Sequence, residues 1–322
     1  SQVRAVAIGM DLRSETDMAW HGRIEPGGGG VTLTLKNGIV IGRIETPAGL
    51  HGLTTLPDGD QVLISYKEDQ FPECAGGIEP ESSEVLHQPM DAPVAEDSAG
   101  RIDVMVLYTP QARIGAGGTP QILAAIQNAV DLANSVFNNS DVFTRFNLVH
   151  SAQISYNDSG NISSDLSWIR NNPSITSLRN SNTADLVSLI VEDGGGSCGV
   201  GYVMHSPDPS FEQYGFQVTV RSCIPNLTWS HEHGHNMGME HDPANGVPPF
   251  AASYQWSFAQ FVDGEFRTVM SYSNQCFFGC PRVGRFSNPA INFNGYPTGI
   301  ANQRDNHRTA NLTDDVVANF RQ

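Results

Sequence analysis

Residues 231–242 read HEHGHNMGMEHD and contain four histidines and three acidic residues. On a helix, His231 and His235 lie one turn apart on a shared face, so both imidazoles can reach a single metal ion. Gly238 permits a positive φ that ends the helix and turns the chain, which brings His241 in as a third ligand. Three protein ligands leave a fourth position open, as is typical of a catalytic zinc site.

Two further features separate this stretch from a chance match. A lone HExxH is a weak signal, but a glycine three residues after it and a histidine three residues later make coincidence improbable. His233 lies between the ligands on a different helix face, so we do not expect it to bind metal. With Met270 downstream in TVMSYS, the segment resembles the metzincin metallopeptidases, whose motif HExxHxxGxxH is followed by a methionine-containing turn beneath the zinc.

The resemblance implies a role for each ligand-forming residue. His231, His235 and His241 would bind one catalytic Zn²⁺, and Glu232 would act as the general base. The implied reaction is peptide-bond hydrolysis, in which zinc acidifies a water while Glu232 takes its proton and passes it to the leaving amine.

The same resemblance assigns supporting roles around the zinc. Met270 would pack beneath the site, and Gly238 would end the zinc helix. Asp242 matches a hydrogen-bonding brace of several metzincin groups, although an ordinary aspartate at a helix exit is an equal alternative. Tyr272 lies where the astacin and serralysin groups carry a tyrosine that binds zinc or stabilises the oxyanion, and simple packing is the alternative.

Three other segments extend the resemblance over about residues 101–322. They are IDVMVLYTPQAR (102–113), ADLVSLIVEDGGGSCGVGYV (184–203) and CPRVGRFSNP (280–289). They look like bacterial secreted metzincins and most closely like the peptidyl-Asp metalloendopeptidases. This implies an extracellular endopeptidase that cuts proteins or peptides on the amino side of aspartate.

Specificity for aspartate requires a cation in the substrate pocket, and arginine is the natural partner for a carboxylate. The chain's two lysines lie at positions 36 and 67, so an arginine must serve in the second part of the chain. We expect Arg285 and Arg282, which follow the methionine turn, ahead of Arg267 and Arg221.

Composition excludes several classes of protein. Eighteen basic against 34 acidic residues give a formal net charge of -16, which disfavours nucleic acids and anionic membranes as partners. No run of about 20 apolar residues is present, so we expect a soluble protein that does not span a membrane. We also expect a monomer. Acidic loops at 192–193 and 314–315 make calcium possible, but the absence of an EF-hand loop favours solvated surface.

Five cysteines indicate two disulfides and one free thiol. Count and spacing favour the pairs Cys198–Cys223 and Cys276–Cys280, and stapled loops are typical of a secreted protein. Cys74 remains unpaired.

The first third of the chain is a separate acidic unit. Residues 1–100 contain 6 basic and 16 acidic groups, against 12 and 18 in the remainder. Alternating apolar and polar residues between 31 and 66 predict a small antiparallel β unit. Residues 78–100 are acidic, proline-containing and aperiodic, as in a linker. We therefore expect a β-rich unit over residues 1–97 and a second domain over 98–322.

The second domain is expected to be α/β (α+β), with a twisted mixed sheet and a zinc-binding helix. The predicted strands are 102–108, 146–154, 185–191, 199–204 and 216–221, and the predicted helices are 119–137 and 305–320.

The free cysteine suggests a function for the first unit. A thiolate is a good zinc ligand, so Cys74 could displace the catalytic water and make residues 1–97 an inhibitory propeptide, in what is called a cysteine switch. A free thiol or an intermolecular disulfide is the alternative. Glu73 could place a carboxylate near the pocket arginine, imitating a substrate. The bonds Met90-Asp91 and Glu96-Asp97 would then permit self-activation.

Two alternative functions stay open at this stage. One is a metzincin endopeptidase of broad or apolar specificity. The other is a catalytically silent zinc-binding or adhesion module, against which the presence of Glu232 and an open zinc position argues.

Overall fold

The N-terminal part of the protein is an antiparallel sheet of six strands arranged in chain order. The computed structural model describes residues 4–25, 28–80 and 100–321. The strands are β1 (Arg4–Ser14), β2 (Asp17–Glu25), β3 (Gly30–Lys36), β4 (Ile39–Thr46), β5 (Gly49–Thr55) and β6 (Gln61–Ser65). The alternation that predicted β3, β4 and β6 is confirmed. The prediction did not include β1, β2 or β5; in β1 the alternating apolar residues Ile8, Met10 and Leu12 are exposed.

The second part is built on a five-stranded mixed sheet of order β10-β11-β9-β7-β8. All neighbours are parallel except the edge pair β10 and β11. The strands are β7 (Arg101–Tyr108), β8 (Arg145–Gln153), β9 (Leu186–Val191), β10 (Gly199–Gly201) and β11 (Phe216–Val220). The predicted mixed sheet is confirmed, and β10 is shorter than expected.

Helices pack on both the sheet and the N-terminal unit. They are α1 (Pro110–Ala116), α2 (Thr119–Asn139), α3 (Ile162–Asn171), α4 (Pro173–Ser181), α5 (Thr228–Asn236) and α6 (Asn306–Val317). The apolar residues that predicted α2, such as Ile122, Ile126 and Val130, all lie in the core. Two predicted helices, α2 and α6, are confirmed within three residues, and α6 begins after Asp305, whose side chain accepts a hydrogen bond from the Arg308 N–H.

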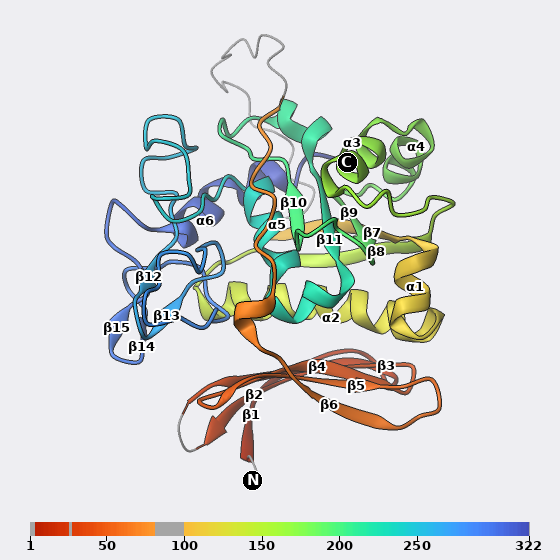
Figure 1. Ribbon diagram of the computed structural model, residues 1–322. Coiled ribbons are helices and arrows are strands. Elements are labelled where there is room, and N and C mark those ends of the chain that lie inside the picture. The colour runs from red at the N-terminus through yellow and green to blue at the C-terminus, as the bar shows by residue number, and fades with distance from the viewer. Residues whose placement is uncertain (1–3, 26–27, 81–99, 322) are drawn as a thin grey trace.

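The long helix α2 is shared by the two parts of the protein. On one side it packs in the core with β8, and on the other the strands β3 and β4 of the N-terminal sheet lie against it (Figure 1). Asp131 of α2 is buried in this interface. It accepts hydrogen bonds from Arg13 of β1, at 2.8 and 3.1 Å, and from the Thr34 hydroxyl of β3, at 2.7 Å.

The chain leaves the N-terminal sheet after β6 and crosses the second part of the protein. A short 3-10 turn (Glu68–Gln70) is followed by an extended segment that runs along α5 and β10 (Figure 1). Backbone hydrogen bonds join residues 73–78 to β10 and its flanks, in the parallel sense. The edge of the mixed sheet is therefore covered by the end of the N-terminal unit.

Short elements complete the second part. Two 3-10 turns cover Pro209–Tyr214 and Arg221–Asn226, and two small ribbons are formed by β12 (Phe261–Val262) with β13 (Phe266–Arg267) and by β14 (Asn292–Phe293) with β15 (Tyr296–Pro297). The structure contains both expected disulfides, Cys198–Cys223 and Cys276–Cys280, and Cys74 is the free cysteine.

Most of the predicted linker, with the bonds Met90-Asp91 and Glu96-Asp97, lies outside the described residues. Over the part of the chain that is described, no helix combines the length and apolar character that crossing a membrane requires.

Candidate metal centre and active site

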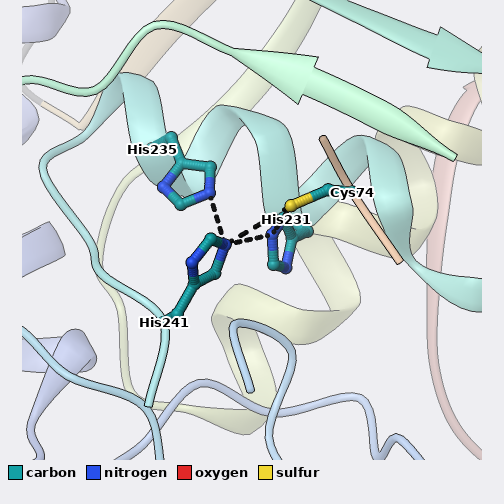
Figure 2. Close-up of side chains that lie close together, drawn as sticks. All are labelled: Cys74, His231, His235 and His241. Atoms are coloured by element: carbon teal, nitrogen blue, oxygen red, sulfur yellow. Dashed lines mark hydrogen bonds between the residues drawn. The ribbon is translucent and has the colours of Figure 1, made fainter. Parts of the chain in front are cut away.

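The helix α5 and the turn after it position three histidines. His231 and His235 lie on α5, one turn apart, and the rings of both are buried. Gly238 has a φ of +82° and ends this helix, and its N–H donates to the carbonyl of His235 at 2.9 Å. The turn returns the chain so that His241 faces the other two histidines (Figure 2). The structure thus brings the three predicted ligands together.

Hydrogen bonds fix which ring nitrogen of each histidine carries the proton. The Nδ1 of His231 lies 2.9 Å from the carbonyl of Val269, that of His235 lies 2.9 Å from the carbonyl of Met239, and that of His241 lies 3.3 Å from the carbonyl of Asn245. A carbonyl only accepts, so each Nδ1 is the protonated donor and each Nε2 keeps its lone pair.

The three Nε2 atoms converge on one point. The Nε2 of His241 lies 3.2 Å from that of His231 and 3.0 Å from that of His235. Burial, and then the neighbouring histidines, lower the pKa of His231 well below its usual range and that of His235 to about 3; burial also lowers the pKa of His241 to about 4. Three neutral acceptors facing one another require a cation, and three imidazoles suit zinc. This donor set fits a zinc ion.

Cys74 closes the fourth side of the cluster. Its Sγ lies 3.2 Å from the Nε2 of His231 and 3.4 Å from that of His241 (Figure 2). The same sulfur lies 2.7 Å from the hydroxyl of Tyr272. The four possible ligand atoms all lie within 4.8 Å of one another. Burial raises the pKa of the Cys74 thiol, whereas binding to a metal requires the thiolate.

Glu232 is buried beside the cluster with its carboxylate unpaired. Its side chain has no exposed surface, and neither carboxylate oxygen has a hydrogen-bond partner among the described residues. Burial raises the pKa of Glu232 well above its usual range. Gly199 of β10 makes room for this carboxylate, because a Cβ at that position would lie 2.4 Å from Oε1. A buried, unpaired carboxylate with a raised pKa is suited to exchanging a proton with a bound water.

The methionine turn, which contains Met270, packs against α5. Met270 is fully buried, and a Cβ on Gly234 of α5 would lie 2.5 Å from its sulfur. Gly234 therefore permits the close approach of Met270. Its position between His231 and His235 indicates such a contact, but the sequence analysis did not include it. His233 is held in the core by Ser188, at 2.8 Å from Nε2, and does not face the cluster.

Asp242 joins the zinc helix exit to the methionine turn. Its carboxylate accepts hydrogen bonds from the backbone N–H of Tyr272 at 3.1 Å, from the Ser271 hydroxyl at 3.2 Å and from the Asn245 amide at 2.9 Å. These bonds place it as a bracing residue, and they orient the loop from which Tyr272 reaches the cluster. The Tyr272 hydroxyl also donates to the carbonyl of Cys74 at 3.2 Å.

The two arginines expected in the substrate pocket lie in different places. Arg282 has a side chain only 3% exposed, and its Nη2 donates to the Glu73 carboxylate at 3.2 Å, next to Cys74. The Arg285 guanidinium instead donates to the carbonyl of Asn139 at the end of α2 and lies near the ring of Phe293. Of the two expected arginines, the structure therefore places Arg282 beside the metal cluster and directs the side chain of Arg285 towards α2.

Two further residues lie beside the Glu73 carboxylate: Ser273, which the sequence analysis missed, and Arg267, which it ranked low. Ser273 donates to the other oxygen of Glu73 from its backbone N–H at 2.8 Å and from its hydroxyl at 2.6 Å. Arg267 lies 3.9 Å from Glu73 and is also 3% exposed. Burial, and then the charge of Arg282, lower the pKa of Arg267 to about 9. No local signal marks Ser273 as a pocket residue.

Comparisons with known proteins identify the family. The M12B reprolysin-like metallopeptidase family matches residues 100–304. Two similar proteins are named peptidyl-Asp metalloendopeptidase: one from Xanthomonas campestris pv. campestris, 30% identical over 99% of this chain and 79% of its own, and one from Stenotrophomonas maltophilia, 30% identical over 94% and 72%.

One solved structure, described as that of a chaperone-substrate complex, resembles the fold with a TM-score of 0.55 and 15% identity, over 91% of this chain and 39% of its own. The family match and the histidine cluster together assign the reaction class. The chain belongs to the reprolysin-like M12B metallopeptidase family and is a zinc endopeptidase.

Proposed function

We propose that this chain is the secreted zymogen of an endopeptidase that hydrolyses peptide bonds on the amino side of aspartate. The observation that carries the proposal is the convergence of three unprotonated Nε2 atoms beside a buried, unpaired Glu232 carboxylate. His231, His235 and His241 would hold the zinc. A silent module would have no use for the unpaired base, which favours an enzyme over that alternative.

The residues of this chain divide the chemistry between them. A zinc ion on the three Nε2 atoms would supply Lewis acidity, which lowers the pKa of water and polarises a carbonyl. Glu232 takes the proton of the attacking water and delivers it to the leaving amine. Tyr272 presents its hydroxyl to the same point and donates a hydrogen bond to the negative oxygen that develops.

Aspartate specificity is supported by the carboxylate already held beside the cluster. Arg282 is buried and paired with Glu73 one residue from Cys74, so a substrate carboxylate at this position would lie next to the reacting bond. The two relatives carry the name peptidyl-Asp metalloendopeptidase. An enzyme of broad or apolar specificity would gain nothing from a buried cation there.

Latency is supported by the place of Cys74. Its sulfur lies where the fourth ligand of the cluster would be, and the segment 73–78 covers the edge strand β10. We infer that residues 1–97 form an inhibitory propeptide and that residues 98–322 form the enzyme. The two disulfides are typical of a protein that acts outside the cell.

A map of cleavage sites tests this function. The 322-residue chain is activated, a denatured protein is digested, and the cuts are located by mass spectrometry with and without a zinc chelator. We expect chelator-sensitive cuts clustered before aspartate. Chelator-sensitive cuts before apolar residues would contradict the specificity, and a folded, zinc-loaded chain that cuts nothing would favour the silent module.

The same experiment addresses self-activation. If the protein cuts its own linker, a Glu232→Ala chain should remain at full length when purified, while the wild-type chain is shortened. Shortening of the inactive variant at the same bonds would assign the processing to another protease.

A further inference from the structure

A complete binding site for a carboxylate lies next to the metal centre. The Ser273 N–H and hydroxyl donate to one oxygen of Glu73, and Arg282 donates to the other. Three donors thus face the two oxygens, and one of them comes from a guanidinium that is 3% exposed, so the site is built for an ionised carboxylate.

Arg282 is held by the N-terminal unit at two further points. Its backbone N–H donates to the Glu68 carboxylate at 3.0 Å, and its carbonyl accepts a hydrogen bond from buried Arg43 of β4 at 2.9 Å. Arg43 also donates to the carbonyl of Pro225 at 2.9 Å. None of these contacts involves the histidines, so they do not depend on a metal ion.

The two neighbouring side chains Glu73 and Cys74 reach different halves of the site. The sulfur faces the histidines, while the carboxylate faces Ser273 and Arg282. The backbone between them is fixed to the edge of the sheet: the Cys198 N–H donates to the Glu73 carbonyl at 3.1 Å, and the Ala75 N–H donates to the Gly199 carbonyl at 2.8 Å. A thiol, rather than a peptide carbonyl, therefore lies at the histidine cluster. The segment 73–78 is bound at the site without being positioned for cleavage.

We propose that Glu73 is a second lock of the propeptide, independent of zinc, which fills the subsite for the substrate's acidic side chain. The subsite consists of Ser273, Arg282 and Arg267, and its ligand class is a side-chain carboxylate. This proposal rests on the proposed function, because the subsite it closes is the one assigned to aspartate.

Hydrogen exchange in the metal-free chain tests the lock without using activity. The 322-residue chain is stripped of metal with a chelator, so that Cys74 has no zinc to bind and no self-cleavage occurs. The exchange of backbone amides in peptides covering residues 72–80 and 197–204 is then followed by mass spectrometry. The Ala75 and Ile78 amides report directly, because both donate to the flanks of β10.

The decisive variant is Glu73→Gln. Both oxygens of Glu73 accept hydrogen bonds, so an amide must turn its NH₂ group towards either the Ser273 backbone N–H or the Arg282 guanidinium, neither of which can accept a hydrogen bond. Asp69→Asn is the matched control, since it removes one charge from an exposed position of the same segment. We expect Glu73→Gln to accelerate exchange at Ala75 and Ile78 by about tenfold or more, and the control to leave it unchanged.

Equal exchange in Glu73→Gln and Asp69→Asn would overturn the second lock. Exchange in β7 and β9 must stay as slow as in the wild-type chain, which shows that the variant is folded. If Glu73→Gln does not fold, it is replaced by Glu73→Asp, which keeps the charge and shortens the side chain, in the same comparison. The proposed function fails separately, since loss of aspartate preference in the cleavage map would leave this exchange result standing.

Discussion

The two halves of the active site are built in different ways. The half that faces the metal comes from one nine-residue helix and the turn after it, and the second nitrogen of every histidine is held by a backbone carbonyl of the same part of the protein. The half that faces a carboxylate comes from loops, and its central residue Arg282 is contacted by Arg43, Glu68 and Glu73 of the N-terminal unit.

The two halves differ in how much they depend on the N-terminal unit. The metal-binding half needs nothing from residues 4–80 except the optional sulfur of Cys74. The carboxylate-binding half contains two buried arginines, which are costly without a negative partner. Glu73 of the N-terminal unit supplies this partner in the structure, and under the proposed function a substrate carboxylate would take its place.

We expect the greatest loss of activity from a substitution in the metal-facing half. Glu232→Gln keeps the shape of the side chain but removes the base, so kcat/KM of the activated enzyme should fall about 10³-fold. Zinc content, measured by elemental analysis, should stay at one ion per chain because Glu232 is not a ligand. A variant that keeps more than a tenth of the activity would remove Glu232 from the role of base.

The next effect tests the carboxylate-facing half. Arg282→Ala should lower the ratio of kcat/KM for a peptide with aspartate after the scissile bond to that for the same peptide with alanine, by about 100-fold. The ratio is independent of how much enzyme is folded. Arg285→Ala is the matched control, since its guanidinium contacts Asn139 at the end of α2, and its ratio should stay unchanged. A fall of the ratio in both variants would contradict the assignment.

A smaller effect concerns the pH dependence of zinc affinity. His235 and His241, with pKa values lowered by burial to about 3 and 4, are neutral above about pH 5 and release no proton on binding. The Cys74 thiol has a raised pKa and must release its proton. Zinc affinity of the wild-type chain should therefore rise with pH, by up to about tenfold per pH unit between 6 and 8, and that of Cys74→Ala should stay nearly flat. Competition with a fluorescent chelator measures both.

A wild-type chain whose zinc affinity is as flat as that of Cys74→Ala would show that the thiol is not a zinc ligand in the latent form.

The weakest effect is expected from a substitution at the interface between the N-terminal sheet and α2, away from both halves of the active site. Arg13→Ala removes the cation that pairs with buried Asp131 between the N-terminal sheet and α2. Arg13 is about one-third exposed, so we expect a loss of only about 1–2 kcal/mol in the free energy of unfolding, measured with urea. Exchange of the amides in 271–283 should rise a few-fold, while that of 231–241 stays unchanged. Arg23→Ala, at an exposed pair, is the control.

An increase in the exchange of 231–241 as large as that of 271–283 would show that the metal-facing half also depends on the N-terminal sheet.

The metal-facing half could be predicted from the sequence, because the residues that form it are close together in the chain. Helical periodicity places His231 and His235 on one face, and Gly238 supplies the turn that His241 needs. The buried strands of the mixed sheet were equally readable as apolar runs. Cysteine count and spacing also gave the two disulfides that the structure contains.

The carboxylate-facing half depends on contacts between segments that are far apart in the sequence. Arg282 and Arg285 lie three residues apart in one loop and look equivalent in sequence, but packing turns Arg282 towards Glu73 and Arg285 towards α2. Ser273 meets Glu73 across 200 residues of chain. Helix periodicity fixes directions within one element, whereas the direction of a loop side chain depends on the distant surfaces that pack against it.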